Sequence, residues 1–152
     1  MVMSDFFQGS KKIALDTNLF IYVFEQHPEF GEKAKTILEQ IEDGIVIAVA
    51  SSVSLTEILV KPIREGNLSL EKQYKLLFSH FPNLTILPID NMVAERAAYL
   101  RGKYNIKTPD ALIIATALVA NADLFITNDP RLEIVKEIKC VSLDQHYDRS
   151  IL

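Results

Sequence analysis

The chain has 152 residues, of which 49% are hydrophobic and 24% are charged. These values are typical of one globular domain, residues 1–152, and argue against a disordered chain. The net charge of −4 argues against a protein that coats duplex nucleic acid through a broad positive field. It does not exclude an enzyme that binds one short strand, because clustered acids can hold metal ions that invert the local charge.

Cysteine content and hydropathy narrow the class of protein further. The single cysteine, Cys140, excludes an internal disulfide and a cysteine-rich zinc site. No apolar run approaches the roughly 18–20 residues of a membrane span, and residues 1–10 lack the pattern of a secretory signal. We therefore expect a cytoplasmic protein with no membrane partner.

The first part of the chain alternates apolar runs with segments of helical periodicity. In chain order the sequence predicts a strand at 13–15, helices at 17–24 and 28–42, a strand at 45–50, and a helix from 52 to about 65. Pro28 fits the first turn of its helix. Pro62, inside the helix that follows the second strand, predicts a kink or an early end.

The second part of the chain continues the alternation. It predicts a helix from 69 to about 81, a strand at 84–89, a helix from 91 to about 105, a helix from 108 to 120 with Thr108 as its N-cap, and strands at 124–127 and 139–143. Strands separated by helices indicate a parallel sheet with helices on both faces. The fold class expected is α/β, a three-layer α/β/α domain with a roughly five-stranded parallel sheet.

Four acids stand at the edges of these predicted elements: Asp16, Glu57, Asp110 and Asp129. In an open parallel sheet, ligands bind outside the carboxyl ends of the strands. Asp16 ends the first strand, Asp129 follows the fourth, and Glu57 lies about one turn into the helix after the second. Asp110 is at the second position of its helix if Thr108 is the N-cap. We therefore expect all four acids at one edge of the sheet.

Each acid also has a purely structural interpretation. Asp16 and Asp129 could cap the elements that follow them, Asp110 would be favoured by the helix dipole, and Glu57 could be a solvated helix residue. These interpretations do not explain the small polar side chains beside the acids: Thr17, Asn18, Thr127 and Asn128. Hydroxyl and amide groups next to carboxylates are suited to orienting them around a metal ion.

Carboxylates forced together repel one another unless a cation neutralises them. Oxygen ligands select Mg²⁺ or Mn²⁺ over zinc. Such ions usually complete their coordination with substrate phosphate, and the chemistry that follows is phosphodiester hydrolysis without a side-chain nucleophile.

Four segments in this order resemble the PIN-domain nucleases, most of all the VapC toxins of type II toxin–antitoxin pairs. They are 13–18 (IALDTN), 54–57 (SLTE), 109–117 (PDALIIATA) and 125–129 (FITND). The resemblance implies an endoribonuclease dependent on Mg²⁺ or Mn²⁺, with the four acids as catalytic metal ligands and Thr127 and Asn128 arranging the metal shell. It also implies a homodimer and a cognate antitoxin that occludes the site.

Basic residues near Asp110 are candidates for holding RNA: Arg96, Arg101, Lys103 and Lys107. Contacts from them to phosphate are plausible, although a solvated helix face would have the same composition. Three other functions stay open on the sequence: a housekeeping RNA-processing nuclease without an antitoxin, a non-catalytic binding module, and a receiver-like domain. The receiver needs paired acids after an early strand, and Asp16 has no acidic neighbour.

Overall fold

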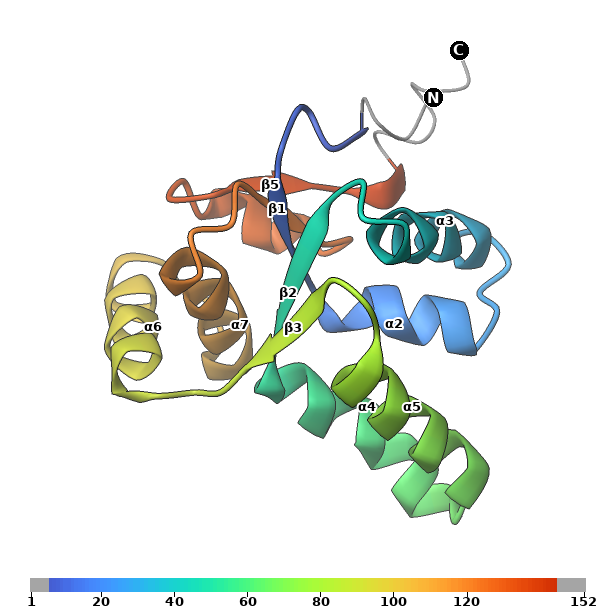
Figure 1. Cartoon of the computed structure of the whole chain (residues 1–152). Helices are drawn as coiled ribbons and strands as arrows, with labels where there is room; N and C mark the ends of the chain where they lie inside the picture. Colours follow the sequence, from blue (N-terminus) through green and yellow to red (C-terminus); the bar gives the residue numbers. More distant parts are fainter. Residues whose placement is uncertain (1–5, 145–152) are drawn as a thin grey trace.

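The computed structural model describes residues 6–144 and shows a five-stranded parallel sheet covered by six α-helices (Figure 1). In chain order the elements are β1 (Lys12–Leu15), α2 (Thr17–Phe24), α3 (Gly31–Glu42), β2 (Ile47–Ser51), α4 (Ser52–Glu65), α5 (Leu68–His80), β3 (Leu84–Leu87), α6 (Asn91–Lys103), α7 (Thr108–Val119), β4 (Leu124–Ile126), the 3₁₀ helix η1 (Pro130–Ile134) and β5 (Lys139–Val141). The predicted fold class is confirmed.

The strand order is β3-β2-β1-β4-β5, with every neighbouring pair parallel. The chain builds one half of the sheet outward from β1 and then returns to build the other half from β4. The order therefore switches between β1 and β4, where a parallel sheet opens a crevice at its carboxyl edge. Asp16 extends the pairing of these two strands, because its N–H donates to the Ile126 carbonyl at 3.0 Å.

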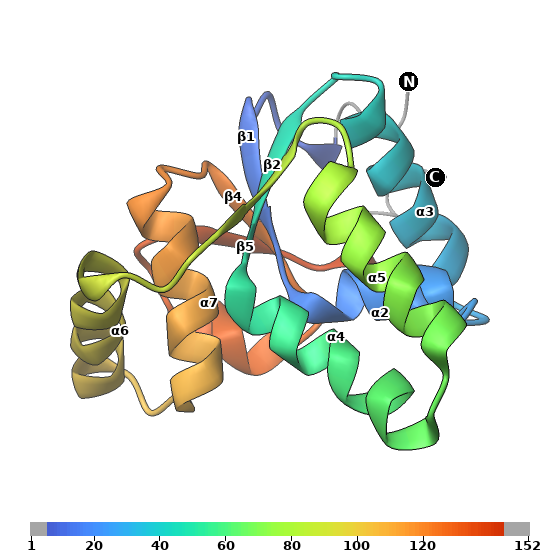
Figure 2. The same cartoon turned by 60° about the horizontal axis from the view of Figure 1, so that its bottom comes forward.

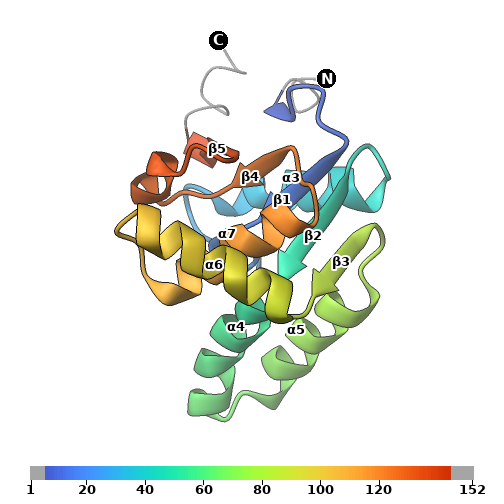
Figure 3. The same ribbon diagram turned by 90° about the vertical axis from the view of Figure 1, so that its left-hand side faces the viewer.

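The alternation of side chains along the strands produces two hydrophobic cores. Ile13 and Leu15 face a core shared with α2, α3, α4 and α5. Ala14 points the other way, into a core with Phe125, α6, α7 and η1. Figure 3 shows α6 and α7 lying over this second face. Both faces of β1 are buried, so the strand is a rigid support for the residue that follows it.

Several predicted helix boundaries differ from the structure, and Pro62 does not end its helix early. The helix predicted from Pro28 begins at Gly31, because His27 Nδ1 accepts the N–H groups of Glu29 and Phe30 and holds residues 28–30 in a turn. The helix α4 continues past Pro62 to Glu65 and ends at Gly66, whose φ of 69° is left-handed. Gly66 can adopt this conformation at little cost because it has no Cβ.

The N-cap of α7 is Lys107, not Thr108 as predicted. The Thr108 hydroxyl instead accepts a hydrogen bond from Arg101 Nη1 at 3.0 Å. This shift places Asp110 at the third position of α7. In the part of the chain between residues 6 and 144, no helix is both long and apolar enough to cross a bilayer.

Candidate active site

Asp16 is held at the end of β1 by hydrogen bonds to both carboxylate oxygens. Oδ1 accepts the Thr17 N–H at 2.8 Å, so Asp16 caps α2. Oδ2 accepts the Thr127 hydroxyl at 2.7 Å, across the switch between β1 and β4. The side chain is only 7% exposed. Asp16 is therefore both a helix cap and a carboxylate fixed at the carboxyl edge of the sheet.

The surroundings of Asp16 favour its protonated form. Burial is the largest cause and raises the pKa of the carboxyl from 3.8 to about 6. The hydrogen bonds from Thr127 and Thr17 lower the pKa, whereas the charges of Asp110 and Glu57 raise it. Three of the four predicted acids thus act on one another electrostatically.

Glu57 faces the start of α2 from the second turn of α4. The Thr17 hydroxyl donates to Glu57 Oε1 and lies 2.8 Å from the Ser54 hydroxyl. Because Thr17 has one hydroxyl proton and gives it to Glu57, Ser54 must be the donor to Thr17. Ser54 is completely buried, and this chain of hydroxyls sets the orientation of Glu57.

Asp110 lies in the first turn of α7, half-buried beside the other acids. Its pKa is raised, first by burial and then by the charges of Asp129 and Glu57, while Arg131 and Lys107 lower it. Figure 2 shows how this becomes possible: α4 starts where β2 ends, and α7 lies beside that point. The fold therefore brings the acid of α7 to the same edge as the acids of β1 and α4.

Asp129 caps η1 and is paired with an arginine. Its Oδ1 accepts the backbone N–H and the Nε of Arg131, both at 3.0 Å, and Oδ2 accepts Nη2 at 2.6 Å. Arg131 accordingly holds the pKa of Asp129 below its usual value. The Thr127 hydroxyl accepts the Asp129 N–H at 3.1 Å while donating to Asp16. Thr127 thus links two of the acids through one oxygen.

The two asparagines predicted to support a metal shell contact none of the acids. Asn18 is exposed. Asn128 points toward the end of β5, where its Oδ1 accepts the Leu143 N–H at 2.8 Å and the Ser142 hydroxyl at 3.3 Å. Its Nδ2 is buried and has no hydrogen-bond partner among residues 6–144. In this conformation Asn128 fastens the chain after β5.

The chemistry of the donor set fits a hard divalent cation. All four candidate ligands are carboxylates, and burial, followed by the charges of neighbouring acids, raises the pKa values of Asp16 and Asp110. Within the described chain no three potential ligands converge closely enough to form a metal site. In this conformation Glu57 is bonded to Thr17, and Asp129 is paired with Arg131.

Comparison with known proteins identifies the family of this arrangement. A sequence model of the PIN domain matches residues 13–138. The chain belongs to the PIN-domain family. The matched range contains all four acids, and membership favours the nuclease interpretation over a receiver-like domain. No curated protein sequence matches the chain.

Solved structures show the same PIN fold. VapBC2 from Rickettsia felis, bound to a promoter DNA fragment, has a TM-score of 0.70 at 19% identity, covering 86% of this chain and 98% of that chain. A toxin–antitoxin complex from Klebsiella pneumoniae has a TM-score of 0.66 at 25% identity, covering 86% and 97%. DNA-bound VapBC from Salmonella typhimurium has a TM-score of 0.65 at 20% identity, covering 87% and 98%.

The four basic residues predicted to hold RNA divide between two surfaces of the PIN domain. Arg101 and Lys107 line a pocket of about 300 Å³ together with Asp110 and Arg131. Arg96 lies in a wider groove of about 690 Å³ on the outer face of α6, where none of the four acids lies.

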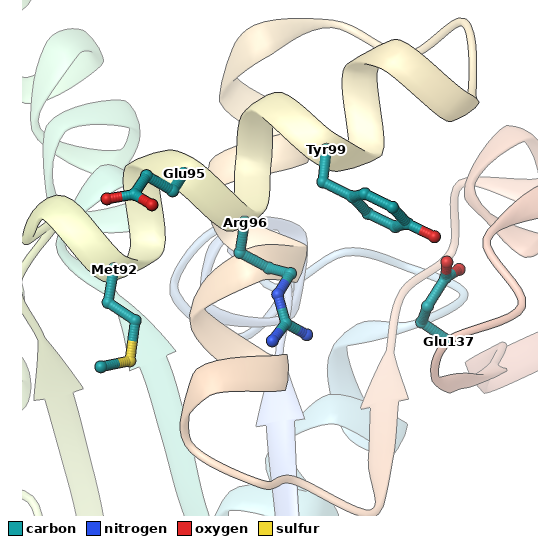
Figure 4. Close-up of a pocket in the computed structure, with 5 residues that line it drawn as sticks. All are labelled: Met92, Glu95, Arg96, Tyr99 and Glu137. Atoms are coloured by element: carbon teal, nitrogen blue, oxygen red, sulfur yellow. The ribbon is translucent and has the colours of Figure 1, made fainter.

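Lys103 lies beside that wider groove, next to Glu137, which lines it. Its Nζ pairs with Glu137 at 2.9 Å, and Figure 4 shows Tyr99 pointing from α6 toward the same glutamate. Only two of the four predicted basic residues are therefore near the acids. Arg131, which reaches Asp129 and Asp110, was missed; an arginine two residues after a capping acid was its signal in the sequence.

Proposed function

We propose that this PIN domain, as a single domain over residues 1–152, is an endoribonuclease that hydrolyses RNA phosphodiester bonds with Mg²⁺ or Mn²⁺. The observation that carries the proposal is the gathering of acids from β1, α4, α7 and the start of η1 at the switch between β1 and β4. Such a group of acids disfavours its own ionisation, and a divalent cation relieves that cost.

Asp16 and Asp110 would hold the cation directly, because both are partly or fully buried and their charges act on each other. Glu57 and Asp129 would complete the set after turning from Thr17 and Arg131. A cation held by these acids would supply Lewis acidity for activating water and for neutralising charge on the scissile phosphate. None of the chain's side chains is needed as a nucleophile.

The threonines position the acids in this proposal. Thr127 donates to Asp16 and accepts from the backbone of Asp129, so the Asp16 carboxylate and the Asp129 backbone are both fixed relative to β4. Thr17, itself fixed by Ser54, holds Glu57 beside the site before the cation binds. Outer partners of this kind govern how well a metal ligand performs.

RNA would approach over the pocket beside Asp110. Arg101 and Lys107 are next to the acids and suit the phosphates flanking the scissile bond. Arg96 and Lys103 would meet only RNA that extends across the outer face of α6.

We also propose that the protein is the toxin of a toxin–antitoxin pair, a cytoplasmic homodimer whose antitoxin covers the site. One of the similar structures is a toxin–antitoxin complex from Klebsiella pneumoniae. An exposed apolar groove on α4 supports a protein partner and is lined by Thr56, Leu59, Val60, Ile63 and Arg64. It begins beside Glu57, so a peptide seated there would lie next to the acids. The alternative is a housekeeping PIN nuclease that needs no antitoxin.

Cleavage of a mixed RNA pool tests the nuclease proposal. Purified protein is incubated with Mg²⁺, Mn²⁺ or chelator, beside Asp16→Asn and the matched control Asp123→Asn at the opposite edge of the sheet. We expect cleavage that requires the metal, falls at least about a hundredfold in Asp16→Asn, and persists in Asp123→Asn. Equal cleavage by Asp16→Asn, with circular dichroism showing it folded, would remove Asp16 from the mechanism.

Growth on expression tests the toxin proposal. We expect growth arrest that depends on Asp16 and is relieved by co-expressing the adjacent gene. Normal growth with cleavage-competent protein would favour the housekeeping nuclease.

A further inference from the structure

The pocket beside Asp110 has a third basic residue, Arg131, in addition to Arg101 and Lys107. Asp110 is the single acid among the residues that line the pocket, and Arg131 is also paired with Asp129, so the three basic residues exceed these two acids by one charge. Arg131 and Lys107 both act on the charge of Asp110, which confirms that they face the acids. A pocket with this charge suits an anion, and the anion that belongs beside a phosphodiester-cleaving site is a phosphate of the substrate.

Arg101 is preorganised in this pocket. Its Nε donates to the Ile106 carbonyl and its Nη1 to the Thr108 hydroxyl, both at 3.0 Å. The Nζ of Lys107 makes no hydrogen bond or ion pair with another residue between 6 and 144. The guanidinium of Arg101 is thus held by neutral oxygens, and the ammonium group of Lys107 has no partner among these residues. Both side chains can therefore bind a phosphate without breaking an ion pair.

Arg131 differs from them because it is committed to Asp129. The guanidinium contacts both oxygens of that carboxylate, in the fork geometry that also fits two oxygens of a phosphate. The arginine side chain is 68% exposed. Because a phosphate offers the same two acceptor oxygens, exchange of Asp129 for a phosphate keeps two charge-assisted hydrogen bonds to Arg131.

We propose that Arg131 is a substrate-phosphate ligand that Asp129 holds in reserve. When Asp129 turns to a divalent cation, Arg131 is released to the phosphate in the pocket it shares with Arg101 and Lys107. This inference rests on the proposed nuclease function and assigns Arg131 a role that depends on whether the acids hold a cation.

Cation binding without RNA tests the release of Arg131. Isothermal titration calorimetry compares Mn²⁺ binding to the full-length wild type, Arg131→Gln and Lys107→Gln. Both variants lose one positive charge that acts on Asp110 and Asp129, but only Arg131 covers the Asp129 oxygens. Because Arg131→Gln frees the Asp129 oxygens, we expect it to tighten Mn²⁺ binding by about fivefold, which corresponds to the upper range for an exposed ion pair. Lys107→Gln should tighten Mn²⁺ binding clearly less.

Salt dependence of RNA binding tests the second half of the exchange. Fluorescence anisotropy follows a short single-stranded RNA with Ca²⁺ or with chelator, and a gel verifies that the RNA is intact afterwards. With Ca²⁺, Arg131→Gln should reduce the slope of log affinity against log salt by about 0.7, the loss of one phosphate contact to a single strand. With chelator, the slope should match the wild type, and Lys11→Gln, at the opposite amino edge of the sheet, should change neither slope.

Equal Mn²⁺ affinities for Arg131→Gln and Lys107→Gln would overturn the inference, as would a slope change that is the same with and without the ion. Absence of Mn²⁺ binding in the wild type would overturn it too. Each of these results can occur while the wild type cleaves RNA. A wild type that cleaves no RNA but shows the expected affinities and slopes would overturn the proposed nuclease function and leave Arg131 as a cation-controlled phosphate ligand.

Discussion

Two aspartates tie β1 to the β4 segment at opposite edges of the sheet, in contrasting surroundings. At the amino edge, Asp123 Oδ2 accepts the N–H groups of Lys11 and Lys12 at 3.1 and 3.2 Å. At the carboxyl edge, Asp16 accepts the Thr127 hydroxyl and is buried among other acids. Asp123 is exposed and needs only backbone donors. Both aspartates connect β1 to the segment of β4 by hydrogen bonds. Only the charged form of Asp16 is destabilised by burial and by repulsion from other acids, and a residue that served only as a cap would not need such surroundings.

The largest expected effect is a pH dependence of stability that comes from Asp16. Its pKa is about 6 in the folded protein against 3.8 ordinarily, so between these values the folded state binds more protons than the unfolded chain. The free energy of unfolding therefore falls as pH rises through this window, by about 3 kcal/mol once pH exceeds 6. Denaturant unfolding in chelator across this range measures it.

Asp16→Asn is the comparison for this profile, because it cannot ionise. The difference between wild type and variant should change by that amount between pH 4 and 6 and stay constant above. Asp129 and Glu137, whose pKa values are lowered by Arg131 and Lys103, are present in both proteins and cancel. A constant difference across the window would mean that the Asp16 carboxyl is not destabilised by its site.

Asp123→Ala should have a smaller effect on stability and none on chemistry. It removes two charge-assisted hydrogen bonds to the backbone of Lys11 and Lys12, and we expect a loss of about 1 kcal/mol because water can replace the carboxylate at this exposed edge. Thermal unfolding and RNA cleavage are measured together. A loss of cleavage in folded Asp123→Ala would contradict the conclusion that only the carboxyl edge of the sheet takes part in the chemistry.

Asp110→Asn should have the smallest effect, and with the opposite sign. Burial and the charges of Asp129 and Glu57 raise the Asp110 pKa, so removing its charge relieves repulsion at neutral pH. The melting temperature in chelator should rise slightly or stay unchanged, while added Mn²⁺ should stabilise the variant less than the wild type. A clear fall in chelator would identify Asp110 as a structural residue of the first turn of α7.

The fold and the common edge of the acids followed from patterns that the sequence displays directly. Continuous apolar runs separated by helical periodicity determine a parallel sheet, and a parallel sheet places Asp16 and Asp129 at one edge whatever the side chains around them. The N-terminal boundary of α7 was predicted one residue late. Thr108 is a residue type that often caps helices, but here its hydroxyl accepts a hydrogen bond from Arg101 instead.

The directions of the side chains and their hydrogen-bond partners could not be predicted in the same way. Asn128 directly follows Thr127, yet the two side chains diverge, since successive residues in an extended chain point in opposite directions. The pairing of Arg131 with Asp129 is local, over two residues, and its spacing is visible in the sequence. The division of Arg96 and Lys103 from Arg101 and Lys107 depends instead on contacts between distant parts of the chain, such as the ion pair of Lys103 with Glu137, and no local spacing encodes it.

In the proposed function the carboxyl edge of the sheet, and not the amino edge, holds the divalent cation. Anomalous scattering from crystals grown with Mn²⁺ tests it directly. We predict an anomalous peak within bonding distance of Asp16 and Asp110, with Asp129 turned from Arg131 toward the ion. Crystals whose only manganese peak lies away from these carboxylates, or that show none at saturating Mn²⁺, would contradict the claim.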